Sequence, residues 1–327
     1  MQAFEYANPT TVKDAVGMLS AQWGEADVLA GGTDLLSLMK EYTHTPKRVV
    51  NIKGIKELGG IQKTSSGLRI GAVVTLDELA TNAAVRSEYP SLVQAALGVT
   101  SPQIRNMGTV GGDLCQRPRC WYFRQGFGIL GQDKNGKSLV QTGENRFHAI
   151  FPQAPAFYVN PSSLAPALIA LGARVTITGP NGSRELSVEK LFVVPKTNKD
   201  RELALAANEI LTAINLPPAK GIKNATYEVR QKQALDWPLT TASVALKMKG
   251  STVTSASIVL GHVGPAPVQA KQAEAMLAGK ALTPDLAADA GKAAANGAQP
   301  MSGTAYKVQL VRTAVKRALL EAMKQRA

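Results

Sequence analysis

The stretch of sequence that decides the fold reads Val-Leu-Ala-Gly-Gly-Thr-Asp-Leu and occupies residues 28–35. The apolar run before the glycines predicts a short strand, and a helical pattern begins after them. Glycine permits positive φ and has no Cβ, so successive backbone N–H groups can converge on an anion. Thr33 and Asp34 stand where the helix begins, and a helix N-terminus adds N–H donors for phosphate. The stretch has the chemistry of a turn that binds a cofactor phosphate.

A second double-glycine turn, Val-Gly-Gly-Asp-Leu, occupies residues 110–114. In both turns the glycine pair follows an apolar residue and precedes a polar one. One Gly-Gly pair is common in ordinary turns, and Asp34 can equally be a helix cap, but two pairs with the same flanking chemistry favour a phosphate site. Neither turn continues into Lys-Ser/Thr or has Gly-x-Gly-x-x-Gly spacing, so ATP or NAD binding in those modes is not expected.

Hydrophobic periodicity around the two turns predicts an α+β chain with two domains. The first 55 residues alternate helix and strand as a small β-α-β unit, and Pro217-Pro218 is a natural boundary. Residues 115–160 form a long insertion with weak hydrophobic periodicity, and a loop of this length is usually functional. We therefore expect an N-terminal domain over 1–220, with lobes over 1–55 and 56–220, and a C-terminal domain over 221–327. The elements expected in the C-terminal domain are strands at 225–229, 242–249 and 255–263 and helices at 270–277, 282–295 and 304–324.

The composition narrows the possible chemistry. The chain has 327 residues, of which 45% are hydrophobic, so it can bury a large core. Its two cysteines, Cys115 and Cys120, and three widely separated histidines do not suit a closed zinc site or a cysteine-ligated Fe–S cluster, so no metal site is expected. No Ser-His-Asp or Cys-His set is apparent, and no catalytic residue is predicted.

The net charge of +13 lies mostly in the C-terminal domain and in residues 101–150. It indicates either the solvated face of an amphipathic helix over 304–324 or a surface for an acidic partner subunit. Aromatic residues make up only 5% of the chain, and no zinc-finger or RNA-binding signature is present, so no nucleic-acid partner is expected. Neither a signal peptide nor an apolar run of the ~20 residues that a membrane span needs is apparent. We expect a cytoplasmic protein, or a periplasmic one only by co-export with a signal-bearing partner.

Several ordered motifs resemble the FAD-binding (medium) subunit of molybdenum hydroxylases, the family of xanthine dehydrogenase, aldehyde oxidoreductase and carbon monoxide dehydrogenase. The motifs that carry the resemblance are Gly31-Gly32-Thr33-Asp34-Leu35, Ile104-Arg105-Asn106-Met107-Gly108-Thr109-Val110-Gly111-Gly112-Asp113 and Pro161-Ser162-Ser163-Leu164-Ala165-Pro166-Ala167. The likeness continues through residues 209–211 and 260–267, so it covers nearly the whole chain. Several motifs in the right order are more specific than any one of them.

The resemblance implies an α+β flavoprotein. Its FAD-binding domain would be two-lobed, of the vanillyl-alcohol-oxidase-like type, and its C-terminal α+β domain would hold a small antiparallel sheet and helices. Val99 and Leu211 fall where relatives place apolar residues against the cofactor, although ordinary core packing explains them equally well. The implied FAD-binding residues are Val28, Leu29, Ala30, Gly31, Gly32, Thr33, Asp34, Leu35, Val99, Thr109, Val110, Gly111, Gly112, Asp113, Ser163, Leu211 and Lys232.

The sequence departs from the family pattern at three places in this set. Asp113 stands where the family often has asparagine, and Ser163 stands where relatives often carry an acid near the FAD. Glu228 lies close to the place of a lysine that reaches the flavin in many relatives, and Lys232 is the nearby substitute. The contacts at Ser163 and Glu228 are therefore the least secure part of the implied site.

The insertion resembles that of relatives which carry an extra [4Fe–4S] cluster, such as 4-hydroxybenzoyl-CoA reductase. Such a cluster needs about four thiolates, and no cysteine follows Cys120, so no [4Fe–4S] cluster is expected here. The arginines of this region either neutralise the FAD diphosphate, face an acidic partner or are solvated; they are Arg105, Arg117, Arg119 and Arg124. The aromatic run Trp121-Tyr122-Phe123 either shields the isoalloxazine or packs the loop.

The leading functional expectation is an FAD-binding electron-transfer subunit of a heterotrimeric molybdenum hydroxylase. The resemblance implies a large subunit with the molybdenum cofactor and a small subunit with [2Fe–2S] clusters. This chain would accept electrons from the small subunit and pass them from FAD to a terminal acceptor. Two alternatives remain open, a flavin-free interaction subunit of the same complex and a stand-alone FAD oxidoreductase.

Overall fold

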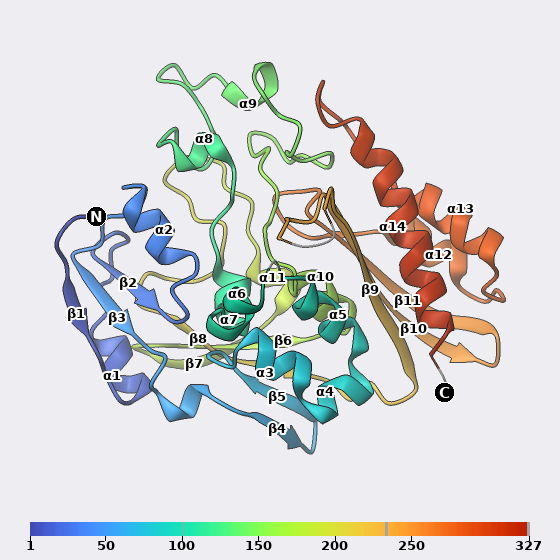
Figure 1. The fold of residues 1–327 in the computed structure, drawn as a ribbon, viewed down its shortest axis with the longest axis horizontal. Coiled ribbons are helices and arrows are strands. Elements are labelled where there is room, and N and C mark those ends of the chain that lie inside the picture. Colours follow the sequence, from blue (N-terminus) through green and yellow to red (C-terminus); the bar gives the residue numbers. More distant parts are fainter. Residues whose placement is uncertain (100, 233–234, 326–327) are drawn as a thin grey trace.

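The computed structural model describes residues 1–99, 101–232 and 235–325. Its N-terminal lobe is a parallel sheet in the order β1-β3-β2, formed by β1 (Glu5–Ala7), β3 (Arg48–Asn51) and β2 (Ala26–Leu29). Parallel neighbours need crossover connections, and α1 (Val12–Gly17) and α2 (Leu35–Lys40) are the helices of these connections. The predicted β-α-β unit is confirmed, and its glycine turn joins β2 to α2 (Figure 1).

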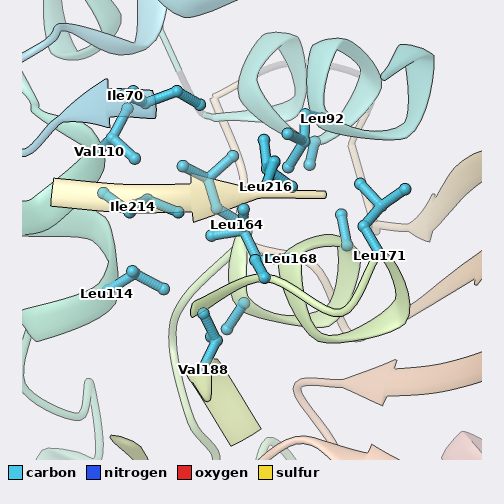
Figure 2. Packing of buried hydrophobic residues seen from close by; sticks show 14 of the residues in the cluster. Ile70, Leu92, Val110, Leu114, Leu164, Leu168, Leu171, Val188, Ile214 and Leu216 are labelled. Carbon is cyan, nitrogen blue, oxygen red and sulfur yellow. The ribbon is translucent and has the colours of Figure 1, made fainter. Parts of the chain in front are cut away.

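The second lobe is built on an antiparallel sheet in the order β4-β5-β8-β6-β7. Its strands are β4 (Ile61–Thr64), β5 (Gly67–Gly71), β6 (Arg174–Gly179), β7 (Gly182–Ser187) and β8 (Ile210–Leu216). Its helices are the short 3₁₀ turn η1 (Lys56–Leu58), α3 (Leu76–Thr81), α4 (Ala83–Glu88), α5 (Pro90–Gly98), α6 (Pro102–Met107), α7 (Val110–Cys115), α10 (Ala165–Ala170) and α11 (Val188–Leu191). Figure 2 shows the core, where Leu164, just before α10, and Leu168 of α10 pack near Ile214 and Leu216 of β8.

The C-terminal unit is an antiparallel sheet covered by helices. Its strands, in the order β12-β11-β10-β9, are β9 (Ile222–Val229), β10 (Thr240–Lys249), β11 (Thr252–Gly261) and β12 (Val268–Gln269). Its helices are α12 (Lys271–Leu277), α13 (Pro284–Ala294) and α14 (Tyr306–Met323), with α14 packed on β9 and β10. Val311, Val315 and Leu319 of α14 are fully buried, whereas Arg312 and Arg317 are exposed. The predicted sheet and helices are confirmed.

The insertion has little regular structure beyond α8 (Trp121–Arg124) and α9 (Leu139–Thr142). It nevertheless has its own apolar cluster, and Leu38 of α2 completes that cluster. The members from the insertion are Phe123, Ile129, Leu130, Ala156 and Tyr158. On the opposite side the insertion meets α14, where the Tyr306 hydroxyl donates to the carbonyl oxygen of Arg146 at 2.8 Å. Figure 1 shows the insertion, in green, extending past α2 on one side and α14 on the other.

A buried lysine joins α14 to the insertion and to β11. The Lys307 side chain is only 1% exposed, and its ammonium donates to the carbonyl oxygens of Phe147 and His262, each at 3.0 Å. Burial lowers the pKa of Lys307 to about 7. A buried ammonium needs such partners because an unpaired buried charge is costly. His262 adopts a positive φ of 61° and is also buried, and its Nδ1 lies 3.0 Å from the Thr241 hydroxyl.

We expect the stability of the protein to fall on acidification, in part through His262. Burial, aided by the nearby Lys307 charge, lowers the pKa of His262 to about 3. Below about pH 6.5 His262 therefore binds a proton in the unfolded state but stays neutral in the folded state. The variant His262→Asn keeps a residue type that tolerates positive φ but cannot titrate there. Urea unfolding should show a pH slope that is smaller in the variant by up to about 1.4 kcal/mol per pH unit between about pH 5.5 and 4, and a much smaller difference near pH 7, where His262 is mostly neutral in both states. Equal slopes in both proteins would contradict this assignment.

Candidate functional site

The two double-glycine turns meet in one cavity of about 570 Å³. A Cβ on Gly31 would lie 1.9 Å from the carbonyl oxygen of Met107, next to Gly108. Only glycine allows the two backbones to approach this closely. Both lobes, the insertion and the C-terminal unit contribute to the cavity lining, the last through Trp237 and Pro238. The turns, far apart in sequence, therefore form one site.

The first turn presents free backbone donors. Within the part of the chain that the structure describes, no acceptor receives the N–H groups of residues 31–34. Gly32 has a φ of 73°, which an L side chain rarely adopts. Unpaired N–H groups in succession beside a cavity are a binding arrangement for an anion.

The second turn differs from the sequence-based expectation because its N–H groups are already used. The N–H groups of residues 110–113 donate at 2.8–3.1 Å to the carbonyl oxygens of Val74, Ala72 and Thr109 and to the Thr109 hydroxyl. A Cβ on Gly111 would approach Ala72 to 2.9 Å. This turn is therefore a packed wall of the cavity rather than a second set of anion donors.

Asp34 occupies the N-cap position of α2, but its side chain makes no capping hydrogen bond, so the interpretation of this carboxylate as a helix cap is wrong. Its carboxylate instead accepts the backbone N–H of Arg117 at 2.7 Å and lies 2.8 Å from the guanidinium groups of both Arg119 and Arg124. These three arginines line the cavity. Arg105 has another role, because its guanidinium donates to the carbonyl oxygen of Val99 at 3.0 Å.

Asp113 organises the loop that precedes α10. Its buried carboxylate accepts the Ser162 hydroxyl, the backbone N–H of Ser163 at 3.3 Å and that of Leu164 at 3.0 Å. The Gln116 amide also donates to it, at 2.9 Å. Burial raises the pKa of Asp113, although these donors oppose the shift. Asp113 and Ser163, two of the departures from the family pattern, are therefore direct neighbours. Position 163 carries no acid, but the carboxylate of Asp113 lies beside it.

Most of the predicted FAD-binding residues line the cavity. They are Val28, Ala30, Gly31, Gly32, Thr33, Asp34, Leu35, Val99, Thr109, Gly111, Gly112, Asp113, Ser163 and Leu211. The lining does not include Leu29, Val110 or Lys232. Side chains alternate along β2, so Leu29 points away from the face that Val28 presents. Val110 is fully buried in the core of the second lobe (Figure 2), and Lys232 is exposed.

Glu228 lies behind the cavity wall rather than on it. Its carboxylate forms an ion pair with Arg230, and a Cβ on Gly98, which lines the cavity, would lie 2.4 Å from one Glu228 oxygen. Burial raises the pKa of Glu228 to about 7, although Arg230 opposes this shift. The side chain is therefore a buried neighbour of Gly98 and is not itself part of the lining.

The aromatic run of the insertion packs the loop. Trp121 makes edge contacts with Phe147 and His148, with ring centroids 5.8 and 5.5 Å apart. Tyr122 donates its hydroxyl to the carbonyl oxygen of Glu144 at 3.2 Å. The Phe123 ring lies under the Arg117 guanidinium. The cavity lining includes none of the aromatic residues 121–123.

Sequence analysis missed a polar network at the lobe-one end of the cavity. Arg117 pairs with Glu202 and donates to His44 Nε2 at 2.7 Å, while His44 Nδ1 faces Asp27 at 3.3 Å. Arg117 therefore fixes His44 with Nε2 as acceptor and Nδ1 as donor. Burial alone would raise the pKa of Asp27, but the hydrogen bond from His44 and the charges of Arg201 and Arg117 lower it overall. No local motif marks these residues, since each partner comes from a different part of the chain. Arg201, which stacks on Trp23 at 4.0 Å, was missed for the same reason.

Fold and cavity together define a two-lobed α+β protein in which both lobes line a cavity with free backbone donors suited to an anion. Residues 2–219 match the family model described as the FAD binding domain in molybdopterin dehydrogenase, and residues 225–322 match the CO dehydrogenase flavoprotein C-terminal domain. The chain belongs to the family of FAD-binding medium subunits of molybdopterin hydroxylases of the CO dehydrogenase, aldehyde oxidoreductase and xanthine dehydrogenase type.

Individual relatives cover most of the chain. It is 33% identical over 282 residues to the FAD-binding subunit of an aldehyde oxidoreductase from Escherichia coli, covering 85% of this chain and 86% of the relative. It is 29% identical to the carbon monoxide dehydrogenase medium chain of Hydrogenophaga pseudoflava, covering 97% and 96%. A solved structure of carbon monoxide dehydrogenase from that organism, which lacks the Mo-pyranopterin moiety of its molybdenum cofactor, matches with a TM-score of 0.78 and 29% identity over 100% of this chain and 99% of that one.

The described residues fit FAD. Free N–H groups at Gly31 and Gly32 suit a diphosphate, a close backbone approach leaves room for it, and a cavity of about 570 Å³ lies in the ~300–1,000 Å³ range of ligand sites. In the same described residues, no group of three or more His, Cys, Asp or Glu side chains suits a metal ion. None of the described helices is long and apolar enough to cross a membrane.

Proposed function

We propose that this chain is the electron-transfer flavoprotein subunit of its complex. It would accept electrons on FAD from a [2Fe–2S] small subunit and pass them to a terminal acceptor, while a large subunit with the molybdenum cofactor oxidises the substrate. The observation that carries the proposal is the free N–H turn at residues 31–34, placed against the backbone at Met107 and Gly108 in a cavity lined by both lobes. The family membership supports the same assignment.

Flavin supplies the redox chemistry, so the chain needs only to bind, orient and shield it. In this proposal the N–H groups of Gly31, Gly32 and Thr33 hold the diphosphate. Val99 and Leu211 provide apolar walls, and both belong to or pack against the core of the second lobe, so they serve as core and as lining. Asp113 fixes the position of Ser163 by accepting its N–H.

The structure weakens the case for a flavin-free subunit. That alternative rests on the changes at Ser163 and Glu228. Ser163 lies beside the Asp113 carboxylate, and Glu228 is paired with Arg230 outside the lining. Neither change fills the cavity or blocks the first turn. We therefore keep FAD binding as the proposed function.

Co-purification tests this function directly. The tagged chain should be isolated from its native host together with any bound subunits, and its visible spectrum and flavin content should be measured. We expect one FAD per chain, a [2Fe–2S] subunit in the isolated complex, and bleaching of the flavin bands when that subunit is reduced. A colourless protein that takes up no FAD on reconstitution would contradict the proposal.

A further inference from the structure

Two arginines of the insertion share one carboxylate oxygen at the edge of the cavity. Arg119 Nη1 and Arg124 Nη2 each lie 2.8 Å from Asp34 Oδ1. The side chains are 29% and 12% exposed, and that of Asp34 is 16% exposed, so water screens the charges only in part. Two guanidinium charges on one carboxylate leave a local excess of positive charge.

The other acids close to the cavity have partners of their own. Asp113, whose charge also acts on Arg119, accepts hydrogen bonds from Gln116, Ser162, Ser163 and Leu164 and forms no ion pair with either arginine. Glu202 pairs with Arg117, and Glu209 pairs with Arg184. The other acid near Arg124 is Glu41, which is 46% exposed and 3.4 Å away, so it is a weak, solvated partner. Burial lowers the pKa of Arg119 to about 10 although Asp34 acts in the opposite direction, and the Arg124 charge adds to the lowering.

The excess charge lies next to the free donors of the first turn. Asp34 is the last residue of that turn, and both arginines line the same cavity as residues 31–34, whose N–H groups are free. Arg119 is also fixed on its other sides. Its guanidinium stacks on the Trp237 ring at 4.8 Å and donates to Gln116 Oε1 at 2.8 Å. It thus links the insertion to lobe one and to the C-terminal unit.

We propose that Arg119 and Arg124 are the cationic contacts of the FAD diphosphate. In this proposal the insertion, residues 115–160, is a strap that holds the two arginines near the first glycine turn. The inference rests on the proposed function, because it assumes that the cavity binds FAD. Guanidinium groups are planar and offer paired donors that match phosphate oxygens. Together with the free N–H groups they would surround a dianion, while Asp34 holds the two arginines in place until the cofactor binds.

The test compares ligands that differ in the diphosphate. Flavin-free wild type, Arg119→Gln and Arg124→Gln would be titrated with FAD, ADP and riboflavin, following fluorescence or heat. We expect each variant to bind FAD and ADP about 10- to 100-fold more weakly, the usual loss of a charged hydrogen bond. Riboflavin, which has no phosphate, should bind equally to all three proteins. Raising salt should weaken FAD binding less in the variants than in wild type.

Arg146→Gln is the matched control. Arg146 belongs to the same insertion, but its side chain is 59% exposed, stacks on Phe147 and is not part of the cavity lining. Its FAD affinity should equal that of wild type. Arg119→Lys should retain part of the affinity, because it keeps the charge without the planar fork.

Three results would overturn the inference. They are unchanged FAD affinity and salt dependence in both glutamine variants, an equal loss for riboflavin and FAD, and an equal loss in the Arg146→Gln control. Failure of wild type itself to bind FAD is a different result, since it would refute the proposed function and not only the role of the two arginines.

Discussion

Replacing Gly31 with alanine is expected to weaken FAD binding by about 100-fold or more. The new Cβ would lie 1.9 Å from the carbonyl oxygen of Met107 and 2.7 Å from its carbonyl carbon. Backbone atoms cannot rotate away as a flexible side chain does, so the first turn and the segment at Met107 and Gly108 must separate. This displaces the free N–H groups of Gly32 and Thr33 from the positions in which they would hold the diphosphate.

Flavin content after purification and the dissociation constant for added FAD measure this effect. Gly54→Ala is the matched control, because a Cβ at Gly54 would meet nothing within 4 Å and its φ is not in the positive range. That variant should bind FAD as wild type does. If Gly31→Ala also retained full affinity, the close contact of Gly31 with Met107 would have no part in cofactor binding.

Asp113→Ala is expected to lower the free energy of unfolding by about 3–5 kcal/mol and to weaken FAD binding as well. The substitution removes the acceptor of the Ser162 hydroxyl and of the N–H groups of Ser163 and Leu164, all of which are buried. Buried donors without an acceptor are costly. Because Ser163 lines the cavity, the loop's loss of order also disturbs the site.

Urea unfolding of the flavin-free protein tests the stability effect, and FAD titration tests the effect on the site. Asp113→Asn should have an intermediate cost, since it keeps one acceptor oxygen but turns an amide donor toward other donors. Asp289→Ala in α13 is the control. Its carboxylate is 54% exposed and pairs with Lys292, so the loss should stay within about 0.5 kcal/mol. A loss for Asp113→Ala no larger than this would contradict the proposed role of the carboxylate.

Local pattern explains which parts of the fold were predictable. The strands β8 to β11 and the helices α12 to α14 carry apolar residues with regular spacing, so their periodicity showed in the sequence. The strand β7 was missed because its first four residues are exposed and show no apolar alternation. The insertion was recognised only as irregular, since its apolar cluster depends on Leu38 from lobe one.

The candidate site was predictable where its chemistry is contiguous in sequence. The first turn carries glycines, Thr33 and Asp34 in one run, and its free donors follow from that run. The use of the second turn's N–H groups could not be predicted, because their acceptors include Ala72 and Val74 in another segment. The domain limits at 1–220 and 221–327, the partner subunits and the compartment stay predictions of the sequence.

The Lys307 contact has a consequence for the order in which the protein matures. Lys307 and Phe147 are 160 residues apart in the chain. Because the chain leaves the ribosome N-terminus first, the insertion emerges long before α14 exists to anchor it. The contacts of the insertion with Asp34 and Leu38 need only residues that are made before it, whereas its contacts with Tyr306 and Lys307 form only once α14 has been made. The insertion is therefore tied to lobe one early in synthesis and to the C-terminal unit at the end of it.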